Sequence, residues 1–154
     1  MAEEEFIPHD EWRTIVDHVP IVAVDLVAHH DGGVLLGRRQ NEPAKDEWFV
    51  PGGRLHKHER LDEAVHRIAA KEMGVEVEID RQLDTYEHVY QTADVSDVDG
   101  KHYIAIGYEV TVVSGELQPD DQHSQLKRFI PPFDPADFHE YVVAYFDTSG
   151  LFTE

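Results

Sequence analysis

An amphipathic helix embedded between segments rich in β-branched residues restricts this chain to folds that combine helices with a sheet. The helix is predicted for residues 60–73, because Leu61, Val65 and Ile68 recur on one face at the helical period. Gly74 is well placed to end it. Apolar segments predict strands at residues 21–29, 34–39, 48–54, 75–79, 83–91, 102–113 and 126–130.

Two further helices are predicted near the ends of the chain, over residues 10–18 and 134–145. The HHDGG sequence at 29–33 predicts a hairpin between the first two strands. Mixed strands with one helix embedded early and one late predict the α+β class rather than strict βαβ alternation. With 154 residues and no repeat or linker, residues 1–154 are expected to form a single domain.

The chain is strongly acidic, with 13 Lys and Arg residues against 32 Asp and Glu and a formal net charge of −19. Such a charge repels phosphate-rich surfaces, so neither nucleic acid nor an anionic membrane is an expected partner. It is also typical of proteins from salt-accumulating cells, where molar salt shortens the screening length to about 3 Å. We interpret the chain as halophilic, and an ordinary soluble protein with an acidic surface is the alternative.

The residues that are missing also limit the chemistry. The absence of cysteine excludes disulfides, thiolate zinc sites and thiol nucleophiles. No segment approaches the about 20 apolar residues that span a bilayer, and the N-terminal MAEEEFIPHD is acidic where a secretory signal is basic. We therefore expect a cytoplasmic protein that acts through histidine, carboxylates, hydroxyls or a bound metal.

One carboxylate falls in the middle of the apolar helix face, at Glu72. A buried carboxylate is costly unless a cation or several donors meet it. The alternative is that the last turn exposes Glu72 to solvent or that it pairs with an arginine elsewhere. Pro51, Gly52 and Gly53 precede the helix, and glycine lets a backbone carbonyl approach a ligand closely. A carbonyl together with a carboxylate suits Mg²⁺ or Mn²⁺.

The stretch GGRLHKHERLDEAVHRIAAKEMGV, residues 52–75, resembles a Nudix box. The family pattern is Gly, five residues, Glu, seven residues, then Arg-Glu-apolar-any-Glu-Glu-any-Gly-apolar. Two positions depart from it, since Ile68 and Lys71 stand where the pattern has glutamates. The resemblance implies a Nudix-type α/β/α sandwich with a mixed β-sheet, and the two missing acids imply fewer metal ions. The matching residues are Gly53, Glu59, Arg67, Ala69, Glu72, Gly74 and Val75.

A second set of motifs narrows the resemblance. WFVPGGR, RIAAKEMG, HY before a strand and PDDQH together resemble the GDP-mannose mannosyl hydrolase branch of the Nudix family, over about residues 6–129. In that branch water attacks the anomeric carbon and releases GDP intact. The resemblance implies one Mg²⁺ or Mn²⁺ per site, held by the carbonyl of Gly52, the carboxylate of Glu72 and the side-chain oxygen of Gln122. It also implies a homodimer.

The same resemblance assigns the residues that carry the reaction. His123, predicted in a loop just before a strand, matches the general base, and a neutral imidazole can take a proton from water. Arg39 and Arg54 match contacts to the diphosphate, where guanidinium groups stabilise the charge that accumulates on GDP. Asp25 and Tyr103 match further catalytic and substrate contacts.

Aromatic residues near the N-terminus match positions associated with the base, namely Phe6 and Trp12. The segment 1–19 is accordingly assigned to base binding or to the dimer interface. Each assigned residue also has a structural interpretation: the arginines in surface ion pairs, the aromatic residues in packing, the aspartate in a strand hydrogen bond and the histidine on the surface. Glu59 and Arg67 are expected to pair and to fix the loop against the helix rather than to act in catalysis.

Three functions therefore remain open at this point. The first is metal-dependent hydrolysis of a GDP-sugar, with GDP-mannose preferred, by attack of water on carbon. The second is a Nudix diphosphatase that cleaves a P–O bond of a nucleoside diphosphate derivative. The third is a noncatalytic Nudix domain that binds a nucleotide.

Overall fold

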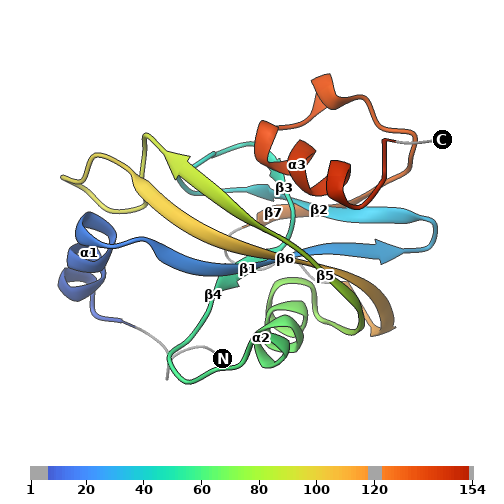
Figure 1. The fold of residues 1–154 in the computed structure, drawn as a ribbon, viewed down its shortest axis with the longest axis horizontal. Coiled ribbons are helices and arrows are strands. Elements are labelled where there is room, and N and C mark those ends of the chain that lie inside the picture. The colour runs from blue at the N-terminus through green and yellow to red at the C-terminus, as the bar shows by residue number, and fades with distance from the viewer. Residues whose placement is uncertain (1–6, 118–122, 153–154) are drawn as a thin grey trace.

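The computed structural model of the chain describes residues 7–117 and 123–152, so Phe6 and Gln122 lie outside the described residues. Within these residues seven strands form one mixed sheet in the order β3-β2-β1-β6-β5, with β4 paired to β1 and β7 paired to β2 (Figure 1). β1 and β6 are parallel, and the other paired strands are antiparallel. The strands are β1 (Ile21–His30), β2 (Gly33–Arg39), β3 (Trp48–Phe49), β4 (Gly52–Arg54), β5 (Val75–Tyr90), β6 (Lys101–Gly115) and β7 (His123–Phe129).

Helices lie on both faces of this sheet. α2 (Leu61–Ile68), continued by the π-helical segment η2 (Ala69–Met73), covers one face and α3 (Glu140–Thr148) covers the other, while α1 (His9–His18) lies near one end (Figure 1). This arrangement confirms the predicted Nudix-type sandwich of the α+β class. None of the helices in the described ranges is long and apolar enough to cross a membrane.

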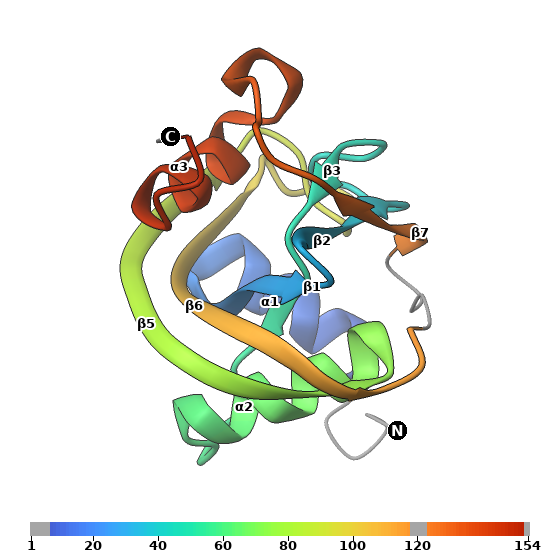
Figure 2. The ribbon, with the colours of Figure 1, turned by 90° about the vertical axis from the view of Figure 1, so that its right-hand side faces the viewer.

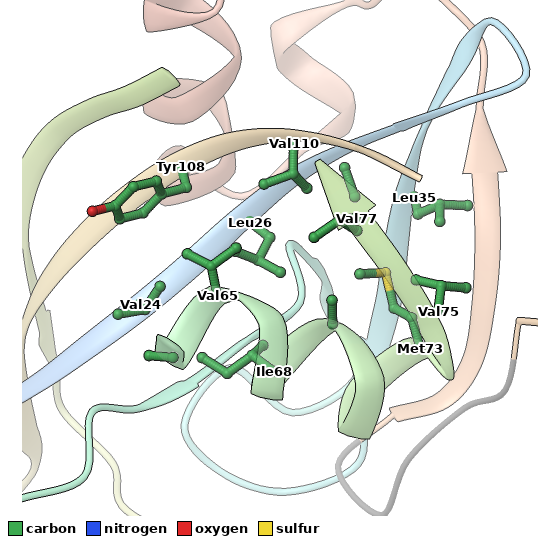
Figure 3. Packing of buried hydrophobic residues seen from close by; sticks show 13 residues of the cluster. Val24, Leu26, Leu35, Val65, Ile68, Met73, Val75, Val77, Tyr108 and Val110 are labelled. Atoms are coloured by element: carbon green, nitrogen blue, oxygen red, sulfur yellow. The ribbon is translucent and has the colours of Figure 1, made fainter. Parts of the chain in front are cut away.

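The alternation of side chains along β1 explains why both faces are covered. Val24 and Leu26 point to the face where Val65 and Ile68 of α2 pack, as Figure 3 shows. The intervening Val27 belongs to the opposite core, which is built with α3. Because β1 is central, a residue at an odd position of this strand lies on the α3 face and one at an even position on the α2 face.

The sheet is strongly bent, and β5 and β6 curve around the molecule in Figure 2. Irregularities interrupt their pairing between Ile79 and Arg81 and between Gln82 and Thr85. Such bulges bend the strand and increase its twist. The sequence predicted two separate strands at 75–79 and 83–91, and this was wrong because the polar segment between them is a pair of bulges within β5 rather than a turn.

Three other boundaries differ from the sequence-based expectations. The strand predicted at 48–54 is divided into β3 and β4, and Val50 and Pro51 lie between the two. The helix predicted at 134–145 is replaced by a 3₁₀ segment, η3 (Pro135–Asp137), and by α3, whose start is fixed by the His139 imidazole accepting a hydrogen bond from the Tyr141 amide at 3.1 Å. His123 was expected in a loop, but it is the first residue of β7.

Candidate active site

The candidate site lies where β1 no longer pairs with β2 and pairs with β4 instead. Near its C-terminal end β1 pairs with β2, whereas Ala23 to Asp25 of β1 pair with β4. Asp25 and Gly52 are direct partners in this short ladder. A Cβ at Gly52 would overlap Asp25 Oδ1, so only glycine allows the backbone of β4 to lie against this carboxylate.

Asp25 is held in position from the α3 face of the sheet. Its Oδ2 accepts a hydrogen bond of 2.5 Å from the Tyr145 hydroxyl. Burial raises the pKa of the Asp25 carboxyl to about 6, and the hydrogen bond from Tyr145 and the positive charge of Arg39 oppose that rise. The carboxylate is therefore ionised at neutral pH but more basic than an aspartate in water.

Glu72 occupies the buried face of the helical segment, as its position in the apolar stripe predicted, and is only 3% exposed. The segment η2 that carries it ends at Gly74, whose φ of 74° is left-handed. β4 lies close to this helix, because a Cβ at Gly53 would be 3.4 Å from Ile68 Cγ1. Ile68 itself is 1% exposed within the core, where the family pattern has a glutamate.

A partly buried ion pair fixes the loop before α2. Arg67 donates from Nε to Glu59 Oε2 at 2.7 Å and from Nη2 to Glu59 Oε1 at 3.0 Å. Arg67 Nη2 also donates to the Arg54 carbonyl at 2.8 Å, and Glu59 Oε1 accepts from the His56 amide at 3.0 Å. These contacts confirm the predicted pairing and tie the loop to the end of β4.

Arg39 and His123 meet across the β2–β7 ladder, where they are Cα partners beyond an irregularity between Arg38 and Arg39. Arg39 Nε donates to the Pro43 carbonyl at 2.7 Å. The sheet register thus brings the predicted general base and a predicted diphosphate contact to neighbouring strands.

Trp12, Arg54 and Tyr103 lie around a common pair of charged residues. Asp94 Oδ2 accepts from Trp12 Nε1 at 3.2 Å, and Asp94 Oδ1 accepts from Lys101 Nζ at 2.8 Å. Lys101 Nζ is 5.1 Å from the ring centroids of both Trp12 and Tyr103. The Arg54 guanidinium carbon is 5.8 Å from the Trp12 ring, so cation–π contacts hold this group together.

Tyr90 connects the two groups of residues. Its ring centroid is 6.1 Å from that of Tyr103. Burial and the negative charge of Asp25 raise the pKa of Tyr90 well above its usual range, and the charge of Arg39 opposes this. Tyr90 is therefore a neutral hydroxyl close to both charged residues at neutral pH.

The donors present fit a hard divalent cation. Glu72 supplies a carboxylate in an otherwise apolar stripe, and β4, which carries Gly52, lies against the helix of Glu72. No three histidine, aspartate or glutamate side chains in the described part of the chain are grouped to hold a metal ion. The metal ligands predicted from the sequence are not such a group of side chains. They are one carboxylate, one backbone carbonyl and the Gln122 amide, and Gln122 lies outside the described residues.

Comparison with known proteins gives the family. A model of the NUDIX domain matches residues 19–148. The chain belongs to the Nudix family. Nudix hydrolases use divalent metal cations, in agreement with the donors described above.

Two curated proteins and one solved structure are among those similar to the chain. It is 54% identical over 141 residues to the low-salt glycan biosynthesis protein Agl8 of Haloferax volcanii, covering 92% of this chain and 89% of that protein. It is 34% identical over 110 residues to an ADP-ribose pyrophosphatase of Methanocaldococcus jannaschii, covering 71% of this chain but only 62% of that protein. A MutT NUDIX hydrolase from Burkholderia pseudomallei superposes with a TM-score of 0.67 at 25% identity, covering 84% of this chain and 97% of the other.

The Nudix fold brings the predicted site residues into two adjoining groups. Asp25, Gly52 and Arg39 lie in the first, with the backbone of His123, and Trp12, Arg54 and Tyr103 lie in the second. Sequence reasoning missed the residues that connect or support these groups, which are Tyr90, Asp94, Lys101 and Tyr145. The TADVSDVDGK segment carried a signal for one of them, because an aspartate before a buried strand can pair with the lysine that begins it.

Proposed function

We propose that this Nudix protein hydrolyses a nucleotide sugar in a metal-dependent reaction, with GDP-mannose as substrate and with GDP and the free sugar as products. The observation that carries the proposal is the environment of Ile68, which stands where the Nudix pattern has a glutamate and is 1% exposed in the core. That position supplies no metal ligand. Lys71 also lacks a carboxylate, so the site has fewer acids than general Nudix diphosphatases use, which supports attack on carbon instead of phosphorus.

The class of substrate is supported by the Haloferax volcanii relative, which is named for glycan biosynthesis. Glycans are assembled from sugars activated as nucleotide derivatives, so an enzyme acting on a nucleotide sugar suits that setting. Trp12 supports the nucleotide part, because its indole, fixed by Asp94, is an aromatic surface on which a base can stack.

Gly52, Glu72 and Gln122 are the residues that would hold the cation, and a bound dication stabilises negative charge on the departing diphosphate. The guanidinium groups of Arg39 and Arg54 bind the same diphosphate. Arg39 is suited to this because its Nε is anchored on the Pro43 carbonyl, which limits the motion of the side chain. The end of β4, which carries Arg54, is held by Arg67, whose Nη2 donates to the Arg54 carbonyl.

The bond changes follow from these positions. The oxygen of water forms a bond to the anomeric carbon, the bond from that carbon to the phosphate oxygen breaks, and its electron pair leaves with GDP. His123 accepts the proton from water. Asp25, which is ionised above a pH of about 6, stabilises the positive charge that develops on the sugar ring.

A Nudix diphosphatase is the second candidate, and the 34% identical ADP-ribose pyrophosphatase favours it. In that reaction water would attack phosphorus, and the oxygen of water would end in a phosphate group. A noncatalytic nucleotide-binding domain is the third candidate, favoured by the loss of acids at Ile68 and Lys71.

Hydrolysis in oxygen-18 water separates the candidates. The protein is incubated with Mg²⁺ or Mn²⁺ in high KCl with GDP-mannose and, separately, ADP-ribose, and the products are analysed by mass spectrometry; a sample without metal is the control. Label in the free sugar is expected. Label in a phosphate product would establish the diphosphatase, and tight binding of GDP-mannose without turnover would establish the binding domain.

We further propose that the functional protein is a homodimer of single-domain chains in the cytoplasm. We expect no nucleic-acid or membrane partner. The N-terminal segment, residues 1–19, contributes to the base site or to the dimer interface. The acidic composition supports the absence of phosphate-rich macromolecular partners. Sedimentation in high KCl, with and without the first 19 residues, tests the assembly and the part that this segment takes in it.

A further inference from the structure

A short hydrogen bond joins the helix α3 to the candidate site. Tyr145 of α3 donates a hydrogen bond of 2.5 Å to Asp25 Oδ2 across 120 residues of sequence. The Tyr145 side chain is fully buried, and burial together with the Asp25 carboxylate holds its pKa far above the ordinary tyrosine value. The tyrosine therefore keeps its hydroxyl proton at neutral pH and donates it to Asp25 Oδ2.

A glycine on the neighbouring strand makes this contact possible. Gly107 of β6 is the direct parallel partner of Asp25. A Cβ at Gly107 would lie 2.9 Å from Tyr145 Cε1 and 3.1 Å from Tyr86 Cε1. The missing side chain thus opens the place on the sheet that the Tyr145 ring fills beside Asp25.

The two oxygens of the Asp25 carboxylate have different neighbours. Oδ2 is bound by the Tyr145 hydroxyl, whereas Oδ1 lies over the Cα of Gly52. A carboxylate fixed at one oxygen and packed at the other has little freedom to rotate. Its orientation toward β4 is therefore set by a residue from the opposite end of the chain.

Tyr145 is itself held rigidly. Its ring meets Tyr86 edge-on at 4.3 Å between centroids and His88 edge-on at 5.7 Å. The Tyr86 hydroxyl donates to Thr148 Oγ1 at 2.8 Å, so it is the ring of Tyr86 and not its hydroxyl that packs against Tyr145. A donor fixed by packing of this kind can preorganise a reactive group.

We propose that Tyr145 is a positioning residue of the active site, which orients the Asp25 carboxylate toward the reacting sugar through its hydroxyl and makes α3 part of the catalytic unit. The proposal rests on the proposed function, because it is there that Asp25 acts on the sugar. Misplacing a reacting group by about 1 Å lowers turnover by up to about 100-fold. Loss of the Tyr145 hydroxyl is expected to act mainly on kcat, since this hydroxyl bonds to Asp25 and not to the arginines assigned to the diphosphate.

The test compares Tyr145→Phe with Tyr86→Phe, a matched control from the same aromatic group that also loses one hydroxyl hydrogen bond but does not touch Asp25. The reaction measured is whichever of the two hydrolyses the wild-type protein performs. Tyr145→Phe is expected to lower kcat by about 10-fold to 100-fold with KM changed by less than about 3-fold. Tyr86→Phe is expected to leave both constants near the wild-type values.

A double-mutant comparison distinguishes positioning from a general loss of structure. If Tyr145 acts through Asp25, adding Tyr145→Phe to Asp25→Asn lowers kcat no further. Equal losses in Tyr145→Phe and Tyr86→Phe, or additive losses in the double variant, would overturn the proposal. If the wild-type protein hydrolysed neither substrate, both the proposed function and the part assigned to Asp25 would fall.

A spectroscopic measurement tests the contact without catalysis. With carbon-13 labelling, the Asp25 carboxyl resonance at one neutral pH should move in Tyr145→Phe and stay in place in Tyr86→Phe. Should Tyr145→Phe fail to fold, Asp25→Asn gives the same information, because the Cζ resonance of Tyr145 should then move and that of Tyr86 should not. Unchanged resonances would show that the hydroxyl does not hold the carboxylate and would end the proposal while leaving the proposed function standing.

Discussion

Arg39 of β2 and His123 of β7 are cross-strand Cα partners, although 83 residues lie between them in the chain. The ladder changes register just before this pair, between Arg38 and Arg39. A change of register alters which side chains share a face of the sheet. Regular pairing would place Ser124 opposite Arg39, so the irregularity decides that Arg39, rather than Gln40, is aligned with His123.

Replacement of Arg39 tests this alignment. Arg39→Lys loses both the planar fork and the hydrogen bond from Nε to the Pro43 carbonyl, so kcat/KM should fall by on the order of 10-fold to 100-fold. Arg38→Lys is the matched control, since Arg38 is exposed and contacts the carbonyl and carboxylate of Asp46. Equal kcat/KM values for the two variants would remove Arg39 from the site.

The core position of Ile68 leads to a prediction about stability. Ile68→Glu restores the family glutamate, but it buries a carboxylate in the α2 core and should lower the free energy of unfolding by about 3 kcal/mol or more. Lys71→Glu restores the other glutamate at an exposed position and should change that free energy by less than about 0.5 kcal/mol. Urea unfolding of both variants gives the comparison, and equal stabilities would mean that position 68 can reach solvent or a cation.

The role of Glu72 predicts a change in metal dependence. Glu72→Gln keeps the size of the side chain and an oxygen, but it removes the charge that would attract a dication, so the metal concentration for half-maximal activity should rise by at least about 10-fold. Glu76→Gln is the control, because Glu76 is exposed on β5 and accepts a hydrogen bond from Ser114. Wild-type metal dependence in Glu72→Gln would place the cation elsewhere.

Local patterns were enough to predict the parts of the site that lie within one segment. The apolar stripe around Glu72 predicted a buried carboxylate, the resemblance to the Nudix box predicted that Glu59 pairs with Arg67, and both features are present. The first depends on the helix period, and the second joins residues that are eight positions apart in the chain. They need no knowledge of how distant strands pair.

Contacts that depend on strand pairing could not be predicted in this way. Asp25 meets Gly107 through the parallel register of β1 and β6, and both strands are apolar along most of their length, so their sequences do not select one alignment. Tyr145 belongs to a helix whose start was predicted too early, because the Pro131-Pro132 and Asp134-Pro135 sequences resemble a helix start more than the His139 cap does. The hydrogen bond between Tyr145 and Asp25 therefore has no counterpart in the sequence pattern.

His88 predicts how stability depends on pH. It is 3% exposed, its ring stacks on Tyr141 at 4.2 Å, and burial followed by repulsion from His139 lowers its pKa from 6.5 to about 4. Below pH 6.5 the unfolded chain binds a proton at this residue that the folded chain does not, so stability contributed by neutral His88 is complete above pH 6.5 and is lost as pH falls toward 4. The loss is on the order of 3 kcal/mol.

Unfolding of His88→Phe between pH 7 and pH 4 measures this contribution. The variant retains an aromatic ring against Tyr141 but has no proton to bind, so wild-type stability should fall relative to the variant as the solution is acidified. His102→Gln is the control, because His102 is exposed on the adjacent strand β6. Parallel stability curves for wild type and His88→Phe would show that His88 is solvated in the folded protein.

The net charge of −19 predicts a strong effect of salt on stability. Repulsion among surface carboxylates opposes the compact state, and raising KCl to the molar range shortens the screening length to about 3 Å and weakens that repulsion. The melting temperature should therefore rise with KCl concentration, and it should rise less in a variant in which exposed acids of β5, such as Glu76 and Glu78, are replaced by glutamine. If the melting temperature rose equally with KCl in wild type and variant, the effect would come from a general action of salt on apolar burial. That action does not depend on the number of surface charges.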